Sequence, residues 1–311
     1  MAEAYRLRNF LHTVVLLGGM SLLVATIGWI FAGWAGIAWA VGLGAVLLFL
    51  GTRASASILL RLYHARPITP REQPELYAIL SELSDRAGLP GPPHLVYIPS
   101  RMIQAFTVEL REGPAIALTD GLLRGLNARE IAAVLAHEIA HVRHGDIRIM
   151  TIADVVTKLT RTFAFAGILL VMISLPLYIA GAAPAPWLAA LLLIGAPTIA
   201  VLLQLALSRT REYDADHTAA VLSGDPEALA SALIMLERYQ GRMWEQMVMP
   251  GYRLPEPSLL RSHPTTADRV ARLQAMPPGR HLRTLAALDS SPALRAAVAR
   301  GPRWTPFGLW Y

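Results

Sequence analysis

The sequence contains no cysteine, which excludes disulfide bonds and any metal site built from thiolates. Charged residues are also scarce, at 16% of the 311 residues, against about 25% in ordinary soluble domains. The scarcity is concentrated in two stretches, 9–52 and 162–208, which contain no Asp, Glu, Lys or Arg. Hydrophobic residues reach 54%. The scarcity of charge excludes an ordinary soluble protein and indicates a membrane protein, and the lack of cysteine agrees with an aqueous part that faces the cytosol.

Each uncharged stretch is long enough for two helical crossings, because one crossing takes about 20 residues. We predict one hairpin of spans at 11–31 and 34–51, turning near Gly33, and a second hairpin of spans at 163–181 and 187–207. A signal peptide is excluded, because the first apolar run is far longer than a signal core and a second span follows at once.

Basic residues flank these spans on one side only. They precede the first and third spans and follow the second and fourth, and both hairpin turns are uncharged: Arg6, Arg8, Arg53, Arg61, Arg66, Arg71, Lys158, Arg161, Arg209 and Arg211. The positive-inside rule makes this side cytoplasmic. We therefore expect a multi-pass protein of the cell membrane with both termini in the cytoplasm. The net charge of +6 is explained by a basic surface facing anionic lipid, without a nucleic-acid partner.

The remaining segments predict a mainly α-helical protein with a small β-sheet, in which two transmembrane hairpins carry one aqueous domain. The predicted parts are a hairpin at 1–52, the first part of the domain at 53–162, the second hairpin at 163–207, the second part of the domain at 208–275 and a tail at 276–311. Within the domain we expect an amphipathic helix over 69–90 that ends at Gly88, and strands at 94–99, 104–110 and 115–123.

A metal motif follows these strands. In "LNAREIAAVLAHEIAHVRHGD", Asn127 and Glu130 have the spacing of a capping box at the start of a helix. On that helix His137 and His141 lie one turn apart on one face, so both imidazoles can reach one ion. Glu138 is rotated by about 100° and can approach a water molecule as general base without binding the metal. The alternative is an amphipathic cytosolic helix with exposed histidines.

A third ligand would favour the metal site. The metzincin spacing requires glycine at position 144 and histidine at 147, but the chain has His144 and Ile147, which excludes that class. In "SRTREYDADHTAA", Glu212 could be the third ligand, and Asp216, on the same helical face, could hydrogen-bond the far nitrogen of a ligating histidine. An ordinary charged face beside the membrane is the alternative. His144 and His217 are rival ligands that we expect to take no part.

This combination resembles the HtpX-like membrane zinc endopeptidases, relatives of the type I CAAX prenyl proteases. The resemblance rests on the first hairpin, "AIALTDGLLRGLNAREIAAVLAHEIAHVRHGDI", the second hairpin, "SRTREYDADHTAA" and "SHPTTADRVARL". It implies a gluzincin site with one Zn²⁺ per chain, in which His137, His141 and Glu212 are the ligands, Glu138 is the general base and Asp216 supports a ligand.

The same resemblance implies two further sets of site residues. His263 and Arg269, in "SHPTTADR", match residues that line the family's active site and are thought to stabilise the oxyanion, a role that requires donors opposite the metal. The family's substrate-binding edge strand usually carries Asn-Ala-Phe. This chain has Gln104, Ala105 and Phe106 at that place, so Gln104 departs from the pattern.

The sequence therefore predicts a membrane-integrated zinc endopeptidase working at the cytoplasmic face. By resemblance, its substrates are misfolded or damaged membrane proteins. An intramembrane protease is excluded because its motif would lie in an apolar span, whereas charged residues such as Arg129 and Arg143 flank this one. A catalytically silent membrane scaffold or chaperone with the same fold is the alternative from another class. The intact Glu138 argues against it.

Overall fold

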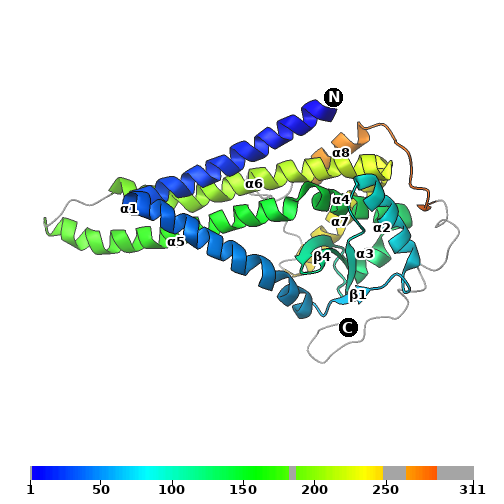
Figure 1. The fold of residues 1–311 in the computed structure, drawn as a ribbon, viewed down its shortest axis with the longest axis horizontal. Helices are drawn as coiled ribbons and strands as arrows, with labels where there is room; N and C mark the ends of the chain where they lie inside the picture. Colours follow the sequence, from blue (N-terminus) through cyan, green and yellow to red (C-terminus); the bar gives the residue numbers. More distant parts are fainter. Residues whose placement is uncertain (1, 182–186, 248–263, 286–311) are drawn as a thin grey trace. The chain divides into compact units, whose positions relative to one another are not determined.

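The computed structural model describes residues 2–181, 187–247 and 264–285 (Figure 1). These residues form two compact units. The first, called the helical unit, consists of residues 2–52 and 148–210, and the second, called the sheet unit, consists of residues 53–147, 211–247 and 264–285. The aromatic end of the predicted tail and His263 lie outside the described residues.

The helical unit takes its helices from α1 (Ala2–Leu62), α5 (Asp146–Ile179) and α6 (Trp187–Ser223). The described residues include four helices that are long and apolar enough to cross a membrane, as the sequence predicts. The break between the first two falls inside α1, where Ala32 and Gly33 leave helical geometry. Gly33 has φ of 58°, a left-handed conformation that glycine adopts without strain. The predicted turn near this glycine is confirmed.

The other two helices extend beyond the predicted spans. Helix α5 begins at Asp146 rather than at 163, and α6 continues to Ser223 rather than ending at 207. The predicted limits were those of membrane spans, set by the absence of charge, and the helices extend beyond them. Charge marks where hydrocarbon ends, but a helix that has already formed propagates into water at little cost.

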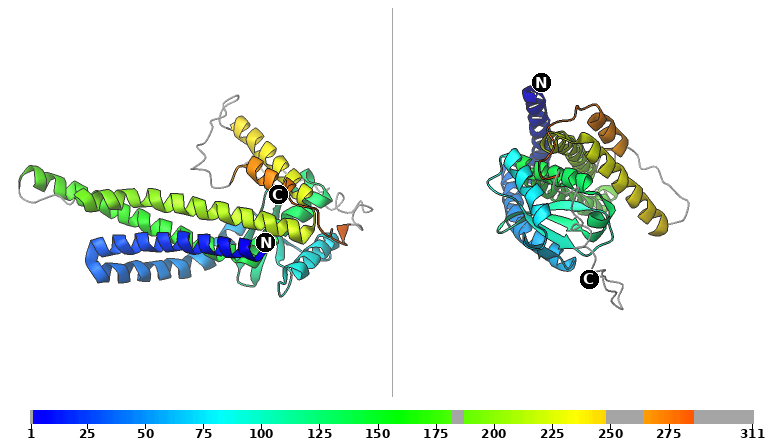
Figure 2. Two further views of the ribbon diagram at one scale, coloured as in Figure 1. Left: turned by 90° about the horizontal axis from the view of Figure 1, so that it is seen from above. Right: turned by 90° about the vertical axis from the view of Figure 1, so that its right-hand side faces the viewer.

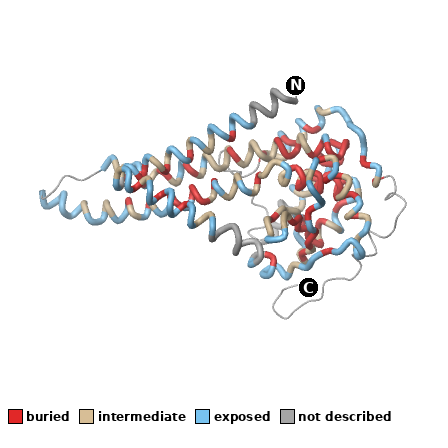
Figure 3. The backbone as a smooth tube through the Cα atoms, in the orientation of Figure 1, coloured by how far each residue is buried: buried red, intermediate tan, exposed pale blue. Residues whose placement is uncertain are grey.

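Small residues and apolar side chains hold the helical unit together. A Cβ atom on Gly36 would collide with the backbone of Gly28, so the first two spans cross at these glycines. Met20 of α1, Leu159 of α5 and Leu207 of α6 are buried in one cluster. The same helices leave many large apolar side chains exposed, and Figure 3 draws the exposed residues in pale blue. Such a surface suits contact with lipid.

The sheet unit is built on four strands in the order β1-β2-β4-β3. They are β1 (Arg66–Ile68), β2 (His94–Ile98), β3 (Ala105–Leu110) and β4 (Gly113–Thr119). Strand β4 pairs parallel with β2 and antiparallel with β3. The strand β3 therefore lies at one edge of the sheet.

The structure shortens one of the predicted strands and adds one strand that was not predicted. The third predicted strand, 115–123, ends as a strand at Thr119, because the Thr119 side chain accepts a hydrogen bond from the backbone N–H of Leu122 and starts α3 (Asp120–Gly125). Strand β1 was missed, since three residues that include Pro67 show too little alternation to be recognised.

Two helices form the hydrophobic core with one face of the sheet, and Figure 2 shows these elements from two further sides. They are α2 (Pro74–Ala87), which ends at Gly88 as predicted, and α4 (Ala128–His144). Leu80 of α2, Ile116 of β4 and Leu135 of α4 are fully buried together. Helices α7 (Pro226–Met247) and α8 (Thr266–Gln274) contribute to the same core.

Candidate metal centre

The motif helix α4 has the predicted start. The Asn127 side chain accepts from the backbone N–H of Glu130, and the Glu130 carboxylate accepts from the backbone N–H of Asn127, so the capping box is confirmed. Ile131 and Leu135 bury one face of the helix. Burial of this face fixes the rotation of α4 and hence the direction of its histidines.

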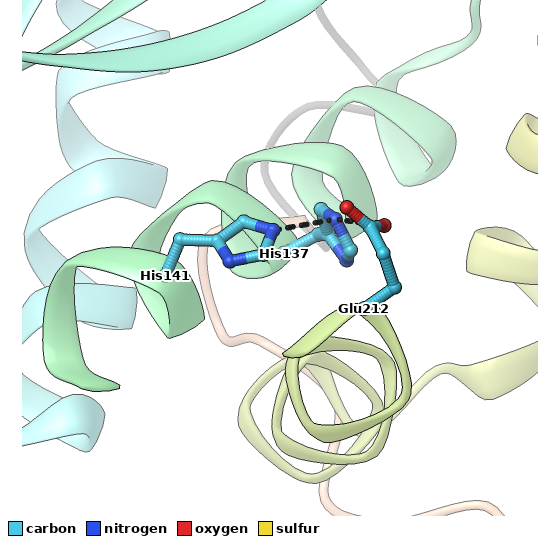
Figure 4. Close-up of side chains that lie close together, drawn as sticks. All are labelled: His137, His141 and Glu212. Atoms are coloured by element: carbon cyan, nitrogen blue, oxygen red, sulfur yellow. Dashed lines mark hydrogen bonds and ion pairs between the residues drawn. The ribbon is translucent and has the colours of Figure 1, made fainter. Parts of the chain in front are cut away.

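His137 and His141 converge at the same face of α4. Their Nε2 atoms are 3.1 Å apart, and the two rings meet edge to face with centroids 4.6 Å apart. The carboxylate of Glu212, from α6, approaches the same point, with its Oε2 atom 3.6 Å from His137 Nε2 (Figure 4). One ligand atom from each of the three residues lies within 4.8 Å of the other two.

These three side chains fit a zinc ion. Tetrahedral zinc with bonds of about 2.0–2.1 Å places neighbouring ligand atoms about 3.3 Å apart. The separations of 3.1 Å between the imidazoles and 3.6 Å between His137 and Glu212 lie on either side of that value, and all three ligand atoms lie within 4.8 Å of one another. Two imidazoles and one carboxylate, with a fourth position left for water, are the donor set of a catalytic zinc site.

A carboxylate and a guanidinium stand behind His137. Asp216 Oδ1 lies 3.1 Å from His137 Nδ1, although the ring N–H is not aligned well enough to count as a hydrogen bond. Arg269, from α8, donates from Nε and Nη2 to the two oxygens of Asp216, each at 2.7 Å, and its Nη1 lies 3.2 Å from Glu212 Oε2. Burial disfavours the charged form of Asp216, but the bonds from Arg269 outweigh this and hold its pKa below the usual range.

A second carboxylate, which the sequence analysis missed, stands behind His141. Asp146 Oδ2 is 2.7 Å from His141 Nδ1, and Asp146 Oδ1 is 3.3 Å from Arg211 Nη1. Burial lowers the pKa of His141, but the hydrogen bond to Asp146 and the negative charges of Glu138 and Glu212 outweigh it and raise the pKa to about 9. The signal in the sequence was the Gly145-Asp146 pair, which ends α4 and starts α5 close to the histidine.

The general-base candidate Glu138 is buried, at 7% exposed. The hydroxyl of Thr107, on β3, donates to Glu138 Oε2 at 2.6 Å. The sequence analysis singled out the neighbouring Gln104, Ala105 and Phe106 but not Thr107. Period-two alternation along the strand, which puts Ala105 and Thr107 on one face, was the available signal.

The other predicted site residues that the structure describes lie outside the group of three ligands. Ala105 and Phe106 belong to the edge strand β3, and Gln104 precedes it, bonded through its backbone to Thr119. The His144 Nε2 atom lies 3.2 Å from the Thr218 hydroxyl, and burial lowers the pKa of His144. Neither His144 nor His217 belongs to the group formed by His137, His141 and Glu212 in the described part of the chain.

The chain is similar in sequence to a known peptidase family. The chain matches the model of peptidase family M48 over residues 70–277. It is 34% identical over 294 residues to the Protease HtpX homolog of Methylibium petroleiphilum, which covers 88% of this chain and 99% of the relative. It is 37% identical over 281 residues to the Protease HtpX homolog of Acaryochloris marina, which covers 85% of this chain and 94% of the relative.

The fold is also similar to a solved structure, the crystal structure of S. mikatae Ste24p. The TM-score is 0.50 at 22% sequence identity, and the match covers 87% of this chain and 66% of that chain. The chain therefore spans slightly less than two thirds of that protein, and the likeness concerns the fold.

Proposed function

The chain belongs to peptidase family M48 and is a membrane metallopeptidase, and from this premise we propose that it is a zinc endopeptidase that cleaves membrane proteins at the cytoplasmic face. The observation that carries the proposal is the convergence of His137, His141 and Glu212 on one point beside the buried Glu138 carboxylate. Ligands and base come from two helices, α4 and α6, which contribute residues to the same hydrophobic core.

The chemistry follows from these side chains. Zinc held by the two imidazoles and Glu212 would lower the pKa of a water molecule to about 7 and polarise the scissile carbonyl. Glu138 takes the proton of the attacking water and returns it to the departing amine, so one water is consumed for each peptide bond cleaved. The products are a new carboxyl end and a new amino end.

In this proposal the two acids that stand behind the histidines orient the metal ligands. Asp146 orients His141 and Asp216 lies against His137, so each ring is directed with its Nε2 atom toward the ion. Arg269 is occupied by Asp216 and Glu212, which makes it a support for the ligand set. The oxyanion role that the resemblance implies for His263 and Arg269 stays a prediction.

The proposal includes the side of the membrane on which the domain lies and the class of substrate that it cleaves. The basic residues beside the spans support a cytoplasmic domain by the positive-inside rule. Glu212 lies on α6, a helix that is long and apolar enough to cross a membrane, and this continuity supports substrates at the bilayer, such as loops of damaged or misfolded membrane proteins. Quality control of membrane proteins is therefore the role we propose.

The decisive experiment replaces the base and leaves the ligands in place. The protein is purified in detergent, its zinc content is measured by elemental analysis, and its initial rate is measured on fluorescein-labelled casein. Glu138→Gln is expected to retain one zinc per chain and to lose proteolysis. Full activity in this variant would overturn the mechanism, and wild-type protein that binds no zinc would overturn the metal assignment.

A further inference from the structure

The hydrogen bond between Thr107 and Glu138 joins the edge strand to the base. The distance of 2.6 Å between Thr107 Oγ1 and Glu138 Oε2 is that of a charge-assisted O–H···O⁻ bond. The same hydroxyl lies 3.5 Å from the backbone oxygen of Glu138, at the limit of a hydrogen bond, so the carboxylate is its main partner.

The threonine is itself held in place. Thr107 lies in the middle of β3 and pairs with Ile116 in the antiparallel register of β3 and β4. A β-branched side chain in a strand has few χ1 conformations, so its hydroxyl has a defined direction. The position of the hydroxyl that donates to Glu138 is therefore fixed by the sheet. The carboxylate that accepts belongs to a different element, the helix α4.

The two oxygens of Glu138 are consequently not equivalent. Oε2 accepts from Thr107, whereas Oε1 makes no hydrogen bond within the residues that the structure describes. A general base must present one oxygen to the water that it deprotonates. A glutamate side chain that is free to rotate spends time in other conformations and loses rate through misplacement.

We propose that Thr107 is a positioning residue for the general base, whose hydroxyl holds Glu138 Oε2 and leaves Oε1 to take the proton of the attacking water. The inference rests on the proposed function, since it requires Glu138 to be the base. It adds a residue from the edge strand to the catalytic machinery and makes the sheet responsible for the geometry of that base.

The test compares three variants of the full-length protein in detergent. Thr107→Val removes the hydroxyl and keeps the shape, Thr107→Ser keeps the hydroxyl, and Thr69→Val is the matched control. Thr69 makes an equivalent hydroxyl-to-carboxylate bond to Glu72 at 3.0 Å on an exposed turn outside the site. Rates on labelled casein are measured over a range of concentrations, together with zinc content and thermal midpoint.

The expected result is a fall of about tenfold in kcat for Thr107→Val, with KM and zinc content unchanged. Thr107→Ser should restore most of the rate, and Thr69→Val should behave as wild type. If Thr107→Val does not fold, Thr107→Ala is compared with Thr107→Ser instead, because alanine also lacks the hydroxyl.

Wild-type kcat in Thr107→Val would overturn the proposal. Equal losses of kcat in the valine and serine variants would also overturn it. So would a loss of activity that comes from a higher KM or a lower zinc content, because each of these results would indicate a purely structural role. Failure of the proposed function is recognised separately: in that case Glu138→Gln stays active, whatever the Thr107 variants do.

Discussion

Asp146 Oδ2 lies 2.7 Å from Nδ1 of His141, on the side of the ring opposite the nitrogen that faces His137. When a metal binds, this contact keeps a proton on Nδ1, so that Nε2 is the nitrogen that offers its lone pair. Arg211 Nη1 lies 3.3 Å from Asp146 Oδ1 and helps to hold Asp146 in place.

Replacing Asp146 by Asn should therefore weaken zinc binding. We expect a loss of about 10- to 100-fold in affinity, the usual effect of removing a carboxylate behind a ligating histidine. Competition with a fluorescent zinc chelator measures it. Asp154→Asn is the control, because Asp154 lies on the same helix but pairs with Lys158 at the surface. Equal affinities for wild type and Asp146→Asn would contradict the assigned role.

Zinc affinity should also depend on pH. The pKa of His141 in the metal-free protein is raised from 6.5 to about 9, so below about 9 a proton must leave before zinc binds. Affinity is expected to rise by about tenfold per pH unit between neutral pH and pH 9. Titrations with the same chelator at two pH values in this window measure the slope, and a flat profile would show that the imidazole is already neutral.

The same shift predicts the pH dependence of stability in the metal-free protein. A raised pKa in the folded state means that protonated His141 stabilises the fold fully below about pH 6.5 and that this contribution is lost as pH rises through about 9. Urea unfolding midpoints in the presence of a chelator should fall across that window. With zinc bound, the fall should disappear, because the metal replaces the proton.

The buried pair of Arg269 and Asp216 should show strong coupling. Their side chains are 9% and 6% exposed, so removing Arg269 leaves Asp216 as a buried charge without its cation, and removing Asp216 leaves Arg269 with Glu212 as its remaining acid. Arg269→Met and Asp216→Asn are each expected to cost about 3–5 kcal/mol of unfolding free energy in metal-free protein. The double variant should lose clearly less than the sum, and additive losses would show that the two residues do not act as a pair.

Close packing of the first hairpin can be tested with alanine. Gly36→Ala places a methyl group against the backbone of Gly28 and should destabilise the hairpin by about 1–3 kcal/mol. Gly42→Ala is the matched control, since a Cβ atom there meets nothing within 4 Å. The thermal midpoint in detergent reports both, and equal midpoints would argue against the close crossing.

The absence of cysteine makes orientation directly measurable. Single cysteines are introduced at Trp34, beside the first hairpin turn, and at Arg111, on the exposed turn between β3 and β4. An impermeant maleimide should label position 34 in intact cells and position 111 only after permeabilisation. The opposite pattern would place the site outside the cytoplasm.

The sequence was informative wherever a property is local. Runs without charge identified four membrane helices because the cost of placing a charge in hydrocarbon applies residue by residue. The Asn127 and Glu130 spacing identified the start of α4, since a capping box involves only neighbours in sequence. The His137 and His141 spacing put both imidazoles on one face for the same reason, and the family followed from these motifs together.

The contacts that orient the metal ligands and the base depend on the tertiary fold. Asp146 and Arg211, or Thr107 and Glu138, meet only after helices and strands have packed, and their sequence separations carry no sign of it. Arg269 is a similar case, because its two hydrogen bonds to Asp216 join segments from different helices. The sequence by itself determined the membrane helices, the motif helix and the family. Only the tertiary structure decided that Asp216 stands behind His137, that Asp146 stands behind His141 and that the Thr107 hydroxyl holds the base, because such contacts depend on the packing of distant elements.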